Sequence, residues 1–390
     1  MKDLDKIIAH LDTTDKSDIA LLSKAYDLIQ QAHAKQTRYS GEPYASHVIQ
    51  VATYLAEMGM SPSTVIAGLL HDTLEDTDVT TKQIMDLFGE EILFLVEGVS
   101  KLGSVRYYGS DRHNESLRKL FVATSQDIRV MIIKLVDRLH NMQTLQYVPT
   151  KKQGRIARET LEIYSPVAHR LGMGRIRKEL EDLAFPYVYP DEYKRVSDLW
   201  QEKTDWAEKR LLQERKSLQK KLGGSNLGDF KTQYRSKGLY SLFQKLKRKK
   251  WDINDIYDLL AMRVLVESVE DCYRVLGIVH KLWRPLPGRV KDYIAFPKPN
   301  GYQSIHTTVA TPSNLILEIQ IRTHGMHQEA EHGIASHIKY KQRQSGENKN
   351  ISQSWFNYLI PNLFQPFTGR KENLTTGGKQ TDPNLSLIHI

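Results

Sequence analysis

The sequence predicts two domains, an all-helical one followed by a mixed α/β one. Its 390 residues are more than a single hydrophobic core usually supports. In the first half, apolar residues recur at helical spacing, as in IALLSKAYDLIQQAH. After GGSNLG at 223–228, β-branched runs such as LLAMRVLVES and LILEIQIRT alternate with helical patterns. Very short connections around NGYQS and TPSN indicate that the sheet contains antiparallel pairs.

The composition limits where the chain works and what it binds. A single cysteine, Cys272, excludes an internal disulfide and fits a reducing compartment. The first residues are charged, and no apolar run is long enough to cross a bilayer, so we expect a cytoplasmic protein with no membrane partner. The net charge of +9 indicates an anionic partner: a nucleotide, a nucleic acid or a membrane surface.

Changes in pattern divide the chain into four parts. We expect the helical domain at 1–153, a central helical connector at 154–200, the α/β domain at 201–345, and a polar, partly disordered tail with one apolar segment at 346–390. Turn residues at SGEP, MSPS and YPDE separate the helices. The highly charged stretch 191–222 is typical of a solvated connecting helix.

The stretch LLHDTLED at 69–76 ends an apolar helix in four ionisable side chains. His71 and Glu75 share one helix face, as do Asp72 and Asp76. Buried unpaired charges are costly unless compensated, and a divalent cation would compensate them. The alternative is an acidic helix end leaving the core, with His71 as an ordinary hydrogen-bonded residue.

Two residues elsewhere favour the metal. His47 lies just inside a helix that opens after Pro43, and Asp137 interrupts the apolar helix MIIKLVDRLHN. A buried Asp needs a cationic partner, a role for which Arg138 and His140 compete with a metal. Two imidazoles and two carboxylates from three helices suit a catalytic transition metal or Mn²⁺ better than a structural zinc.

The order H…HD…D resembles the HD-domain phosphohydrolase superfamily. That resemblance implies that Glu75 and Asp76, one turn beyond the ligands, face the metal-bound water as its orienter or as general base and acid.

The second half lacks both common glycine-rich phosphate loops, so side chains must hold any phosphates. The basic residues of the helix at 245–250 are typical of a solvated face. By contrast, the strand–loop–strand GRVKDYIAFPKPNGYQSIHTT spreads Lys298, Asn300, Tyr302 and His306 around a turn, where binding residues are common.

Two carboxylates stand out among these cations. Asp258 opens an apolar strand, and Glu318 interrupts another. Each could pair with a neighbouring Arg; together, on neighbouring strands, they would hold Mg²⁺ and activate a hydroxyl for phosphoryl transfer.

The motifs together resemble the long Rel/SpoT-type synthetase/hydrolases of the alarmones (p)ppGpp. The matching stretches are RYSGEPYASH, LLHDTLEDT and KLVDRLHNMQTL in the first half, and YRSKGLYSLFQK, IYDLLAMRV, GRVKDYIAFPKPNGYQSIHTTV, LEIQIRT and MHQEAEHGIASH in the second. The resemblance covers about residues 15–341 and implies an HD-type hydrolase domain followed by a nucleotidyltransferase-like synthetase domain.

The resemblance also implies roles for individual residues. In the hydrolase, His47, His71, Asp72 and Asp137 would bind Mn²⁺, Glu75 and Asp76 would be catalytic, and Arg38, Asn141 and Thr144 would line the nucleotide pocket. In the synthetase, Asp258 and Glu318 would be the catalytic Mg²⁺ carboxylates. The nucleotide-binding set would be Arg235, Lys237, Ser241, Lys245, Arg289, Lys291, Tyr293, Lys298, Asn300, Tyr302, Gln303 and His306, with Tyr302 stacking on guanine.

The motif Arg289-Val290-Lys291-Asp292 resembles the bifunctional form of the family, so the resemblance implies both activities. One is transfer of pyrophosphate from ATP to the 3′-hydroxyl of GDP or GTP. The other is hydrolysis of (p)ppGpp, as in the stringent response. It further implies a catalytic fragment without the regulatory C-terminal domains, through which any ribosome association would run. Two alternatives remain: an HD nucleotidase whose second domain only senses nucleotide, and a basic nucleic-acid-binding module.

Overall fold

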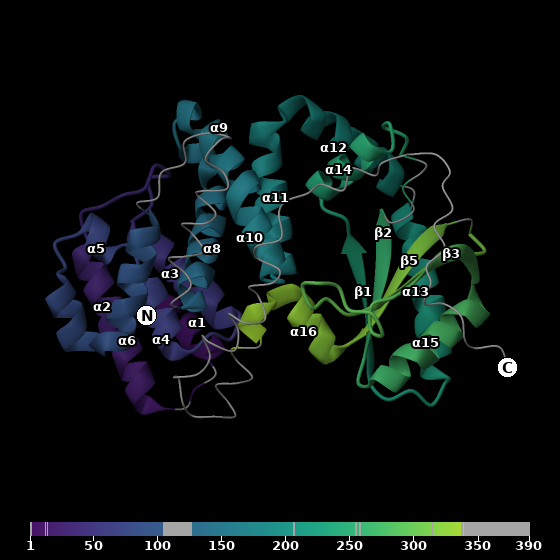
Figure 1. Cartoon of the computed structure of the whole chain (residues 1–390), viewed down its shortest axis with the longest axis horizontal. Helices are drawn as coiled ribbons and strands as arrows, with labels where there is room; N and C mark the ends of the chain where they lie inside the picture. Colours follow the sequence, from purple (N-terminus) through teal and green to yellow (C-terminus); the bar gives the residue numbers. More distant parts are fainter. Residues whose placement is uncertain are drawn as a thin grey trace, which may run out of the picture.

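A computed structural model describes residues 2–103, apart from 12 and 14, and residues 127–338, apart from 206, 254–255, 257–258, 314 and 337. The expected tail at 346–390 and the candidate carboxylate Asp258 lie outside the described residues. Figure 1 shows a helical half and a half built around one sheet. This confirms the predicted fold class. No helix of the described residues combines the length and apolar character needed to cross a membrane.

The helical half begins with helices that pack around an apolar core. They are α1 (Lys2–His10), α2 (Lys16–Ala32), α3 (Ala45–Glu57), α4 (Pro62–Leu70), α5 (Thr73–Asp76), α6 (Thr81–Gly103) and α8 (Ile128–Gln143). Aspartates cap the N-termini of α2 and α8. The Asp15 carboxylate accepts a hydrogen bond from the Ser17 amide, and the Asp127 carboxylate accepts one from the Arg129 amide. Pro62 opens α4 at a position where its missing N–H is harmless.

The helix expected through LLHDTLED is interrupted at its centre. Helix α4 ends at Leu70, and the one-turn helix α5 starts only at Thr73, so His71 and Asp72 occupy the junction. Every residue of α4 from Thr64 to Leu70 is buried. The core therefore anchors the helix that delivers the His-Asp pair, and the break turns the following acidic residues toward the surface.

The helical core continues beyond residue 153. It includes η2 (Leu145–Tyr147), α9 (Thr150–Glu159), the π-helical η3 (Thr160–Tyr164), α10 (Ser165–Arg170) and α11 (Gly174–Val188). Ala157, Ile163 and Leu180 are buried in the same cluster as the residues of α3, α4 and α8. Helix α12 (Pro190–Asp205) instead packs with α14 (Leu239–Arg248), and Phe185 of α11 stacks on Phe243 in the same apolar cluster.

The stretch 191–222 is not solvated throughout, as expected of a connecting helix. It lies in α12 and α13 (Ala207–Gly223), and Leu211, Leu218 and Leu222 of α13 are buried in the core of the sheet domain. The charged residues between these leucines obscure their helical spacing in the sequence. The packing on the sheet shows that α13 is part of the second domain.

The second domain contains a mixed five-stranded sheet. Its strands are β1 (Phe230–Ser236), β2 (Leu260–Val266), β3 (Arg284–Asp292), β4 (Ile305–Ala310) and β5 (Ile316–Thr323), in the order β1-β2-β5-β4-β3. The β2–β5 pair is parallel and the other three pairs are antiparallel, as expected from the short connections. Helices α15 (Val269–Leu282) and α16 (His324–His332) complete the domain.

The two faces of the sheet differ in chemistry because side chains alternate along each strand. Met262, Val264, Leu317, Ile319 and Ile321 lie in a buried cluster with residues of α13 and α15. The residues between them belong to the other face, and several are charged. The sheet therefore buries one apolar face and presents a polar one.

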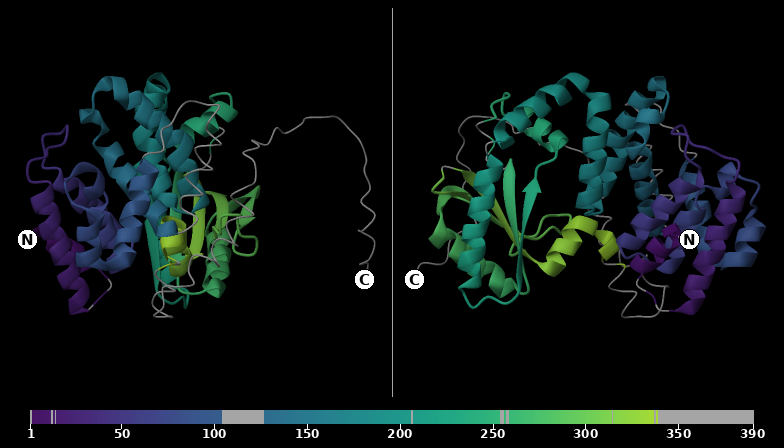
Figure 2. Two further views of the ribbon diagram at one scale, coloured as in Figure 1. Left: turned by 60° about the vertical axis from the view of Figure 1, so that its left-hand side comes forward. Right: turned by 180° about the vertical axis from the view of Figure 1, so that it is seen from behind.

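The two halves meet at a tight backbone contact. The amide of Ile334 donates to the carbonyl of Leu171 at 3.0 Å, and Ile334, Ala335 and Ile338 are buried in the helical core. Gly333 has a φ of +58°, and a Cβ there would lie 2.1 Å from the Leu171 carbonyl oxygen. Figures 1 and 2 show α16 between the two halves. Only glycine fits this junction.

Candidate metal centre and nucleotide site

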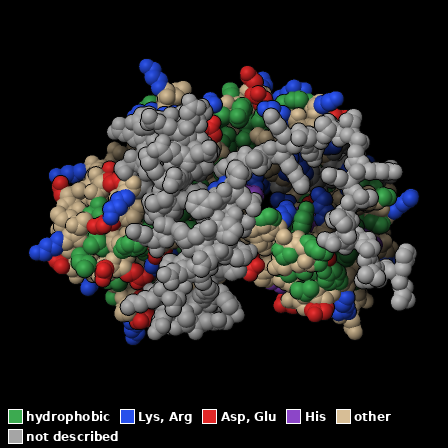
Figure 3. Space-filling view, viewed as in Figure 1, with side chains coloured by type: hydrophobic (Ala, Val, Ile, Leu, Met, Phe, Trp, Pro, Cys, Tyr) green, Lys and Arg blue, Asp and Glu red, His purple; other side chains and the backbone are tan. Residues whose placement is uncertain are grey.

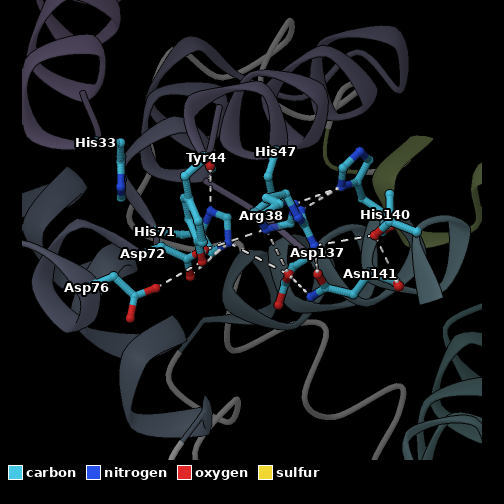
Figure 4. Close-up of polar contacts among 12 residues, drawn as sticks. His33, Arg38, Tyr44, His47, His71, Asp72, Asp76, Asp137, His140 and Asn141 are labelled. Atoms are coloured by element: carbon cyan, nitrogen blue, oxygen red, sulfur yellow. Dashed lines mark hydrogen bonds and ion pairs between the residues drawn. The ribbon is translucent and has the colours of Figure 1, made fainter. Parts of the chain in front are cut away.

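Three helical segments bring a His-His-Asp cluster together in the first domain (Figure 4). His47 comes from α3, His71 from the end of α4 and Asp137 from α8, and all three are buried. One potential ligand atom of each lies within 4.8 Å of the others. The Asp137 Oδ1 atom is 3.3 Å from His47 Nε2 and 3.8 Å from His71 Nε2. Asp72 adjoins the cluster, 3.1 Å from His71 Nε2 and 3.5 Å from His47 Nε2.

The backbone fixes which nitrogen of His71 faces this cluster. Its Nδ1 lies 2.8 Å from the carbonyl oxygen of Gly68, which can only accept, so Nδ1 carries the hydrogen. Within the part of the chain that the structure describes, the buried Nε2 makes no hydrogen bond. Burial lowers the pKa of His71, but the Asp72 and Asp137 carboxylates outweigh it and raise the pKa to about 9. The two carboxylates therefore make this position favourable for positive charge.

Lys134, rather than either sequence candidate, is the cationic partner of Asp137. Its Nζ lies 2.8 Å from Asp137 Oδ2, while Arg138 pairs with Glu159 at 3.3 Å. Burial raises the pKa of Asp137, but the opposing effects of Lys134 and the two histidines hold it well below its usual range. The i,i+3 spacing of Lys134 and Asp137 in an apolar helix was the sequence signal for this pair.

Tyr44 joins two of the acidic residues of LLHDTLED. Its hydroxyl lies 2.8 Å from Asp72 Oδ2 and 2.9 Å from Asp76 Oδ2. Burial, followed by the charge of Asp72, raises the pKa of this hydroxyl above its usual range, so it stays protonated and donates. Glu75 is exposed, one turn beyond Asp72. The sequence interpretation overlooked Tyr44, although it directly follows Pro43 at the start of α3.

The three residues expected to line a nucleotide pocket do lie together. The Arg38 guanidinium donates to Asn141 Oδ1 at 2.7 Å and to Thr144 Oγ1 at 3.4 Å. It also lies 3.1 Å from Nδ1 of His140, which the sequence offered only as a possible partner of Asp137. Burial, then His47 and Arg38, lower the pKa of His140 to about 3.

The residues of this cluster fit a divalent cation. Two imidazole nitrogens and two carboxylates form the donor set, and His71 Nε2 is a buried polar atom that lacks a hydrogen bond. The second shell is also present: Gly68 orients His71, and Lys134 and Asn141 hold the carboxylate of Asp137.

The polar face of the sheet forms the second candidate site. Strand register places Gln233, Arg263, Gln320, His306 and Lys291 in one row across all five strands. The neighbouring row contains Arg235, Ala261, Glu318 and Thr308. Figure 3 shows Lys and Arg side chains gathered in a recess over β1 and β2. Because Asp258 lies outside the described residues, its expected pairing with Glu318 stays a prediction.

Glu318 contacts two residues of the polar face, His306 and Gln320. Its Oε1 lies 3.5 Å from His306 Nδ1 and accepts from the Gln320 amide at 2.6 Å. Burial, then Lys298 and Arg235, lower the pKa of His306 to about 3. The cations dominate the electrostatic field here, which favours anionic ligands.

Aromatic rings line the loop that follows β3. The Tyr302 hydroxyl lies 2.9 Å from His306 Nε2, and Tyr293 packs edge-on against both rings. The Lys298 ammonium lies 4.5 Å from the Tyr293 ring centre and 4.8 Å from that of Tyr302. The structure thus brings together four residues that the sequence placed around this loop and in the nucleotide set.

The remaining candidates lie on the surrounding elements. Arg235 is exposed at the end of β1, and Lys237, Ser241 and Lys245 are half-buried before and along α14. Arg289 and Lys291 are exposed on β3. Asn300 donates to the His169 carbonyl of the helical half at 3.4 Å, and Gln303 to the carbonyl of Ile294 at 3.3 Å.

Two arginines of the polar face were missed. Arg263 and Arg322 each lie 3.2 Å from Glu331 of α16, and Arg322 lies 2.7 Å from His327 Nδ1. Both guanidinium Nε atoms are buried and have no hydrogen-bond partner among the described residues. Burial, followed by the charge of Arg322, lowers the pKa of Arg263 to about 10. In the sequence, the alternation of Arg with apolar residues in LAMRVLV and LEIQIRT was the signal that could have identified these two arginines.

Known families match both parts of the chain. The HD domain matches residues 25–174, and the region found in RelA/SpoT proteins matches residues 234–345. A guanosine-3′,5′-bis(diphosphate) 3′-pyrophosphohydrolase of Aquifex aeolicus is 43% identical over 366 residues, covering 93% of this chain and 51% of the relative. A GTP pyrophosphokinase of Streptomyces coelicolor is 47% identical over 328 residues, covering 84% and 38%.

A third relative carries both activities in its name. The bifunctional (p)ppGpp synthase/hydrolase RelA of Mycobacterium tuberculosis is 44% identical over 336 residues, covering 86% of this chain and 45% of the relative. The chain thus spans about half the length of these curated relatives, or less.

The fold and its two sites define an HD-domain protein joined to a RelA/SpoT-type domain. With relatives of both names similar to it over most of its length, the chain belongs to the Rel/SpoT family.

Proposed function

We propose that this chain is a bifunctional alarmone enzyme. It transfers pyrophosphate from ATP to the 3′-hydroxyl of GDP or GTP, and it hydrolyses (p)ppGpp to GDP or GTP plus pyrophosphate. One observation carries the proposal: each half has its own polar cluster, with a His-His-Asp cluster in the helices and Glu318 among cations on the sheet. Relatives named for each activity support it.

For hydrolysis, His47, His71, Asp72 and Asp137 would hold Mn²⁺, which would supply Lewis-acid activation of the attacking water. Asp76, oriented by Tyr44, and Glu75 would serve as the acid and base of the reaction. Arg38, Asn141 and Thr144 contact the nucleotide from the opposite side of the cluster. The candidate ligands His47, His71 and Asp137 are buried, whereas Glu75 and Asp76 are exposed at the edge of the cluster.

For synthesis, the polar face of the sheet binds the two nucleotides. Arg235, Lys237, Ser241 and Lys245 bind ATP, Tyr302 stacks on guanine, and Lys298 and His306 line the acceptor pocket with Asn300. Arg289, Lys291, Tyr293 and Gln303 complete the nucleotide-binding set. Glu318 removes the proton of the 3′-hydroxyl, and with Asp258 it holds Mg²⁺.

The wider context is also part of the proposal. The chain acts in the cytoplasm in the stringent response, and it needs no nucleic acid for either reaction. The domain boundaries stay at 1–153 for the hydrolase, 154–200 for the connector and 201–345 for the synthetase. Helices between 151 and 222 couple the two sites so that one is open while the other is closed. Simultaneous maximal rates of both reactions in one preparation would contradict this coupling.

A two-way activity assay tests the function. The chain is incubated with ATP, GDP and Mg²⁺, and separately with ppGpp and Mn²⁺, and the nucleotides are separated by ion-exchange chromatography. We expect Glu318→Gln to abolish only synthesis and Asp72→Asn to abolish only hydrolysis, because each removes one carboxylate from one site. A chain inactive in both assays refutes the proposal.

A further inference from the structure

His140 connects a predicted nucleotide-binding residue to a candidate metal ligand, although the proposed function gives it no role. Its side chain leaves α8 one turn after Asp137 and lies between Arg38 and His47 (Figure 4). The Nδ1 atom of His140 is 2.7 Å from Nδ1 of His47 and 3.1 Å from an Arg38 guanidinium nitrogen. The Nδ1 atom of His140 therefore lies within hydrogen-bonding distance of both His47 and Arg38.

The rules of donors and acceptors decide where the hydrogens lie. A guanidinium group has no acceptor, so Arg38 must donate and the Nδ1 of His140 must accept. The Nδ1 of His47, which shares that acceptor, must then be the donor. In neutral His47, the lone pair is consequently on Nε2, the atom 3.3 Å from Asp137 and 3.5 Å from Asp72. This is the tautomer that a metal ligand requires.

Asn141 connects Arg38 to a second candidate ligand, Asp137, in a similar way. Its amide nitrogen lies 2.6 Å from Asp137 Oδ1, so its amide oxygen faces Arg38, which donates to it at 2.7 Å. Among the contacts of the described residues, Arg38 makes no hydrogen bond or ion pair with a candidate ligand. Arg38 instead contacts His140 and Asn141, which do contact candidate ligands. His140 orients His47, and Asn141 orients Asp137.

We propose that His140 is a positioning residue that keeps His47 in its metal-binding tautomer. Together with Asn141, it makes the affinity for a divalent cation depend on Arg38. The inference rests on the metal site of the proposed function. A ligand that changes the contacts of Arg38 therefore changes the affinity for the cation. Because coupling between two sites is reciprocal, the cation changes the affinity for that ligand by the same factor.

Metal binding in the absence of nucleotide tests this directly. The full chain is stripped of metal and titrated with MnCl₂ by isothermal titration calorimetry. We expect His140→Leu, which removes the acceptor, to weaken Mn²⁺ binding about 10–100-fold, as for other second-shell residues. His140→Asn places an amide oxygen near the former Nδ1, so we expect its Kd to stay within about threefold of the parent chain.

Arg38→Met provides a second variant outside the core, so the test does not depend on the folding of the His140 variants. We expect a severalfold weaker Mn²⁺ affinity. In the double variant with His140→Leu, the additional loss should be smaller than the loss that Arg38→Met causes alone, because both act through one chain of contacts. Tyr54→Phe is the matched control: it removes another hydrogen bond between α3 and α8, from Tyr54 to Gln143 at 3.0 Å, and should leave the Kd unchanged.

Three results would overturn the inference: an unchanged Kd in His140→Leu, an equal loss in His140→Asn and His140→Leu, or fully additive losses in the double variant. None of them bears on catalysis. Conversely, the expected Mn²⁺ pattern in a chain that does not hydrolyse ppGpp would refute the proposed hydrolase and leave the role of His140 intact.

Discussion

The two candidate sites differ in how they are enclosed and charged. In the helical half, His47, His71 and Asp137 are 4% exposed or less, and their partners already satisfy most of their polar atoms. On the sheet, Arg235 is exposed and Glu318 faces a field dominated by cations. The first site is preorganised for one small ion. The second presents excess positive charge, which suits large polyphosphate ligands that bring their own negative charge.

Because the two sites are enclosed to different degrees, we expect the loss of a carboxylate to destabilise the chain more in the helical half than on the sheet. Asp137→Ala leaves the half-buried Lys134 without this partner and should destabilise the chain by about 3–5 kcal/mol. Glu318→Ala removes a contact from a face with surplus positive charge, and should cost less than about 1 kcal/mol. Urea unfolding followed by circular dichroism measures both. Equal losses would show that the two sites are equally enclosed.

The junction between the halves allows the next largest effect. Gly333→Ala forces a φ of +58° on a residue with a Cβ, which costs about 1–3 kcal/mol, and drives that Cβ into the Leu171 carbonyl. We expect a lower midpoint of thermal unfolding and changes in both activities.

Gly154→Ala is the matched control for this substitution. Gly154 lies in helix α9, where an added Cβ meets nothing within 4 Å, so we expect a small gain in stability. If Gly333→Ala is as harmless as Gly154→Ala, the halves are not joined through this turn.

The open sheet site should lose affinity when its aromatic platform is removed. Tyr302→Ala takes away the ring proposed to stack on guanine, and stacking on an aromatic side chain is worth about 1–3 kcal/mol. We expect a higher KM for GDP, an unchanged KM for ATP and unchanged ppGpp hydrolysis. Tyr302→Phe keeps the ring and loses only the contact with His306, so its KM should stay close to that of the parent chain. A rise in both KM values would argue against a guanine-specific role.

Cys272 reports how well the apolar side of the sheet domain is closed. It is fully buried, and burial, then Asp271 and Asp292, raise the pKa of its thiol to about 12. Only the thiolate reacts with Ellman's reagent, so we expect almost no reaction in the folded chain at pH 8 and complete reaction in urea. Because the folded thiol keeps its proton where the unfolded thiol has lost it, this group also lowers stability above about pH 9. Rapid labelling of the folded chain would show that this layer opens.

Much of the architecture could be predicted from periodicity. Helical spacing identified the first half, and the change to β-branched runs after residue 223 identified the sheet domain. Glu318 was identified as a carboxylate that interrupts the apolar strand LILEIQIRT, and its neighbours Leu317 and Ile319 are buried in the apolar core of the sheet domain. Helix α13 was misjudged because its buried leucines are separated by charged residues, which hid its packing on the sheet.

By itself, the sequence determined the types and order of the reactive side chains, because imidazoles and carboxylates interrupting apolar helices demand compensation wherever the helices pack. Only the tertiary structure decided their partners. That Lys134 rather than Arg138 pairs with Asp137, that Tyr44 joins Asp72 to Asp76, and that His140 lies between Arg38 and His47 all depend on side-chain direction and on contacts between residues up to about a hundred positions apart. Periodicity along one helix carries no information about where a neighbouring helix places its side chains.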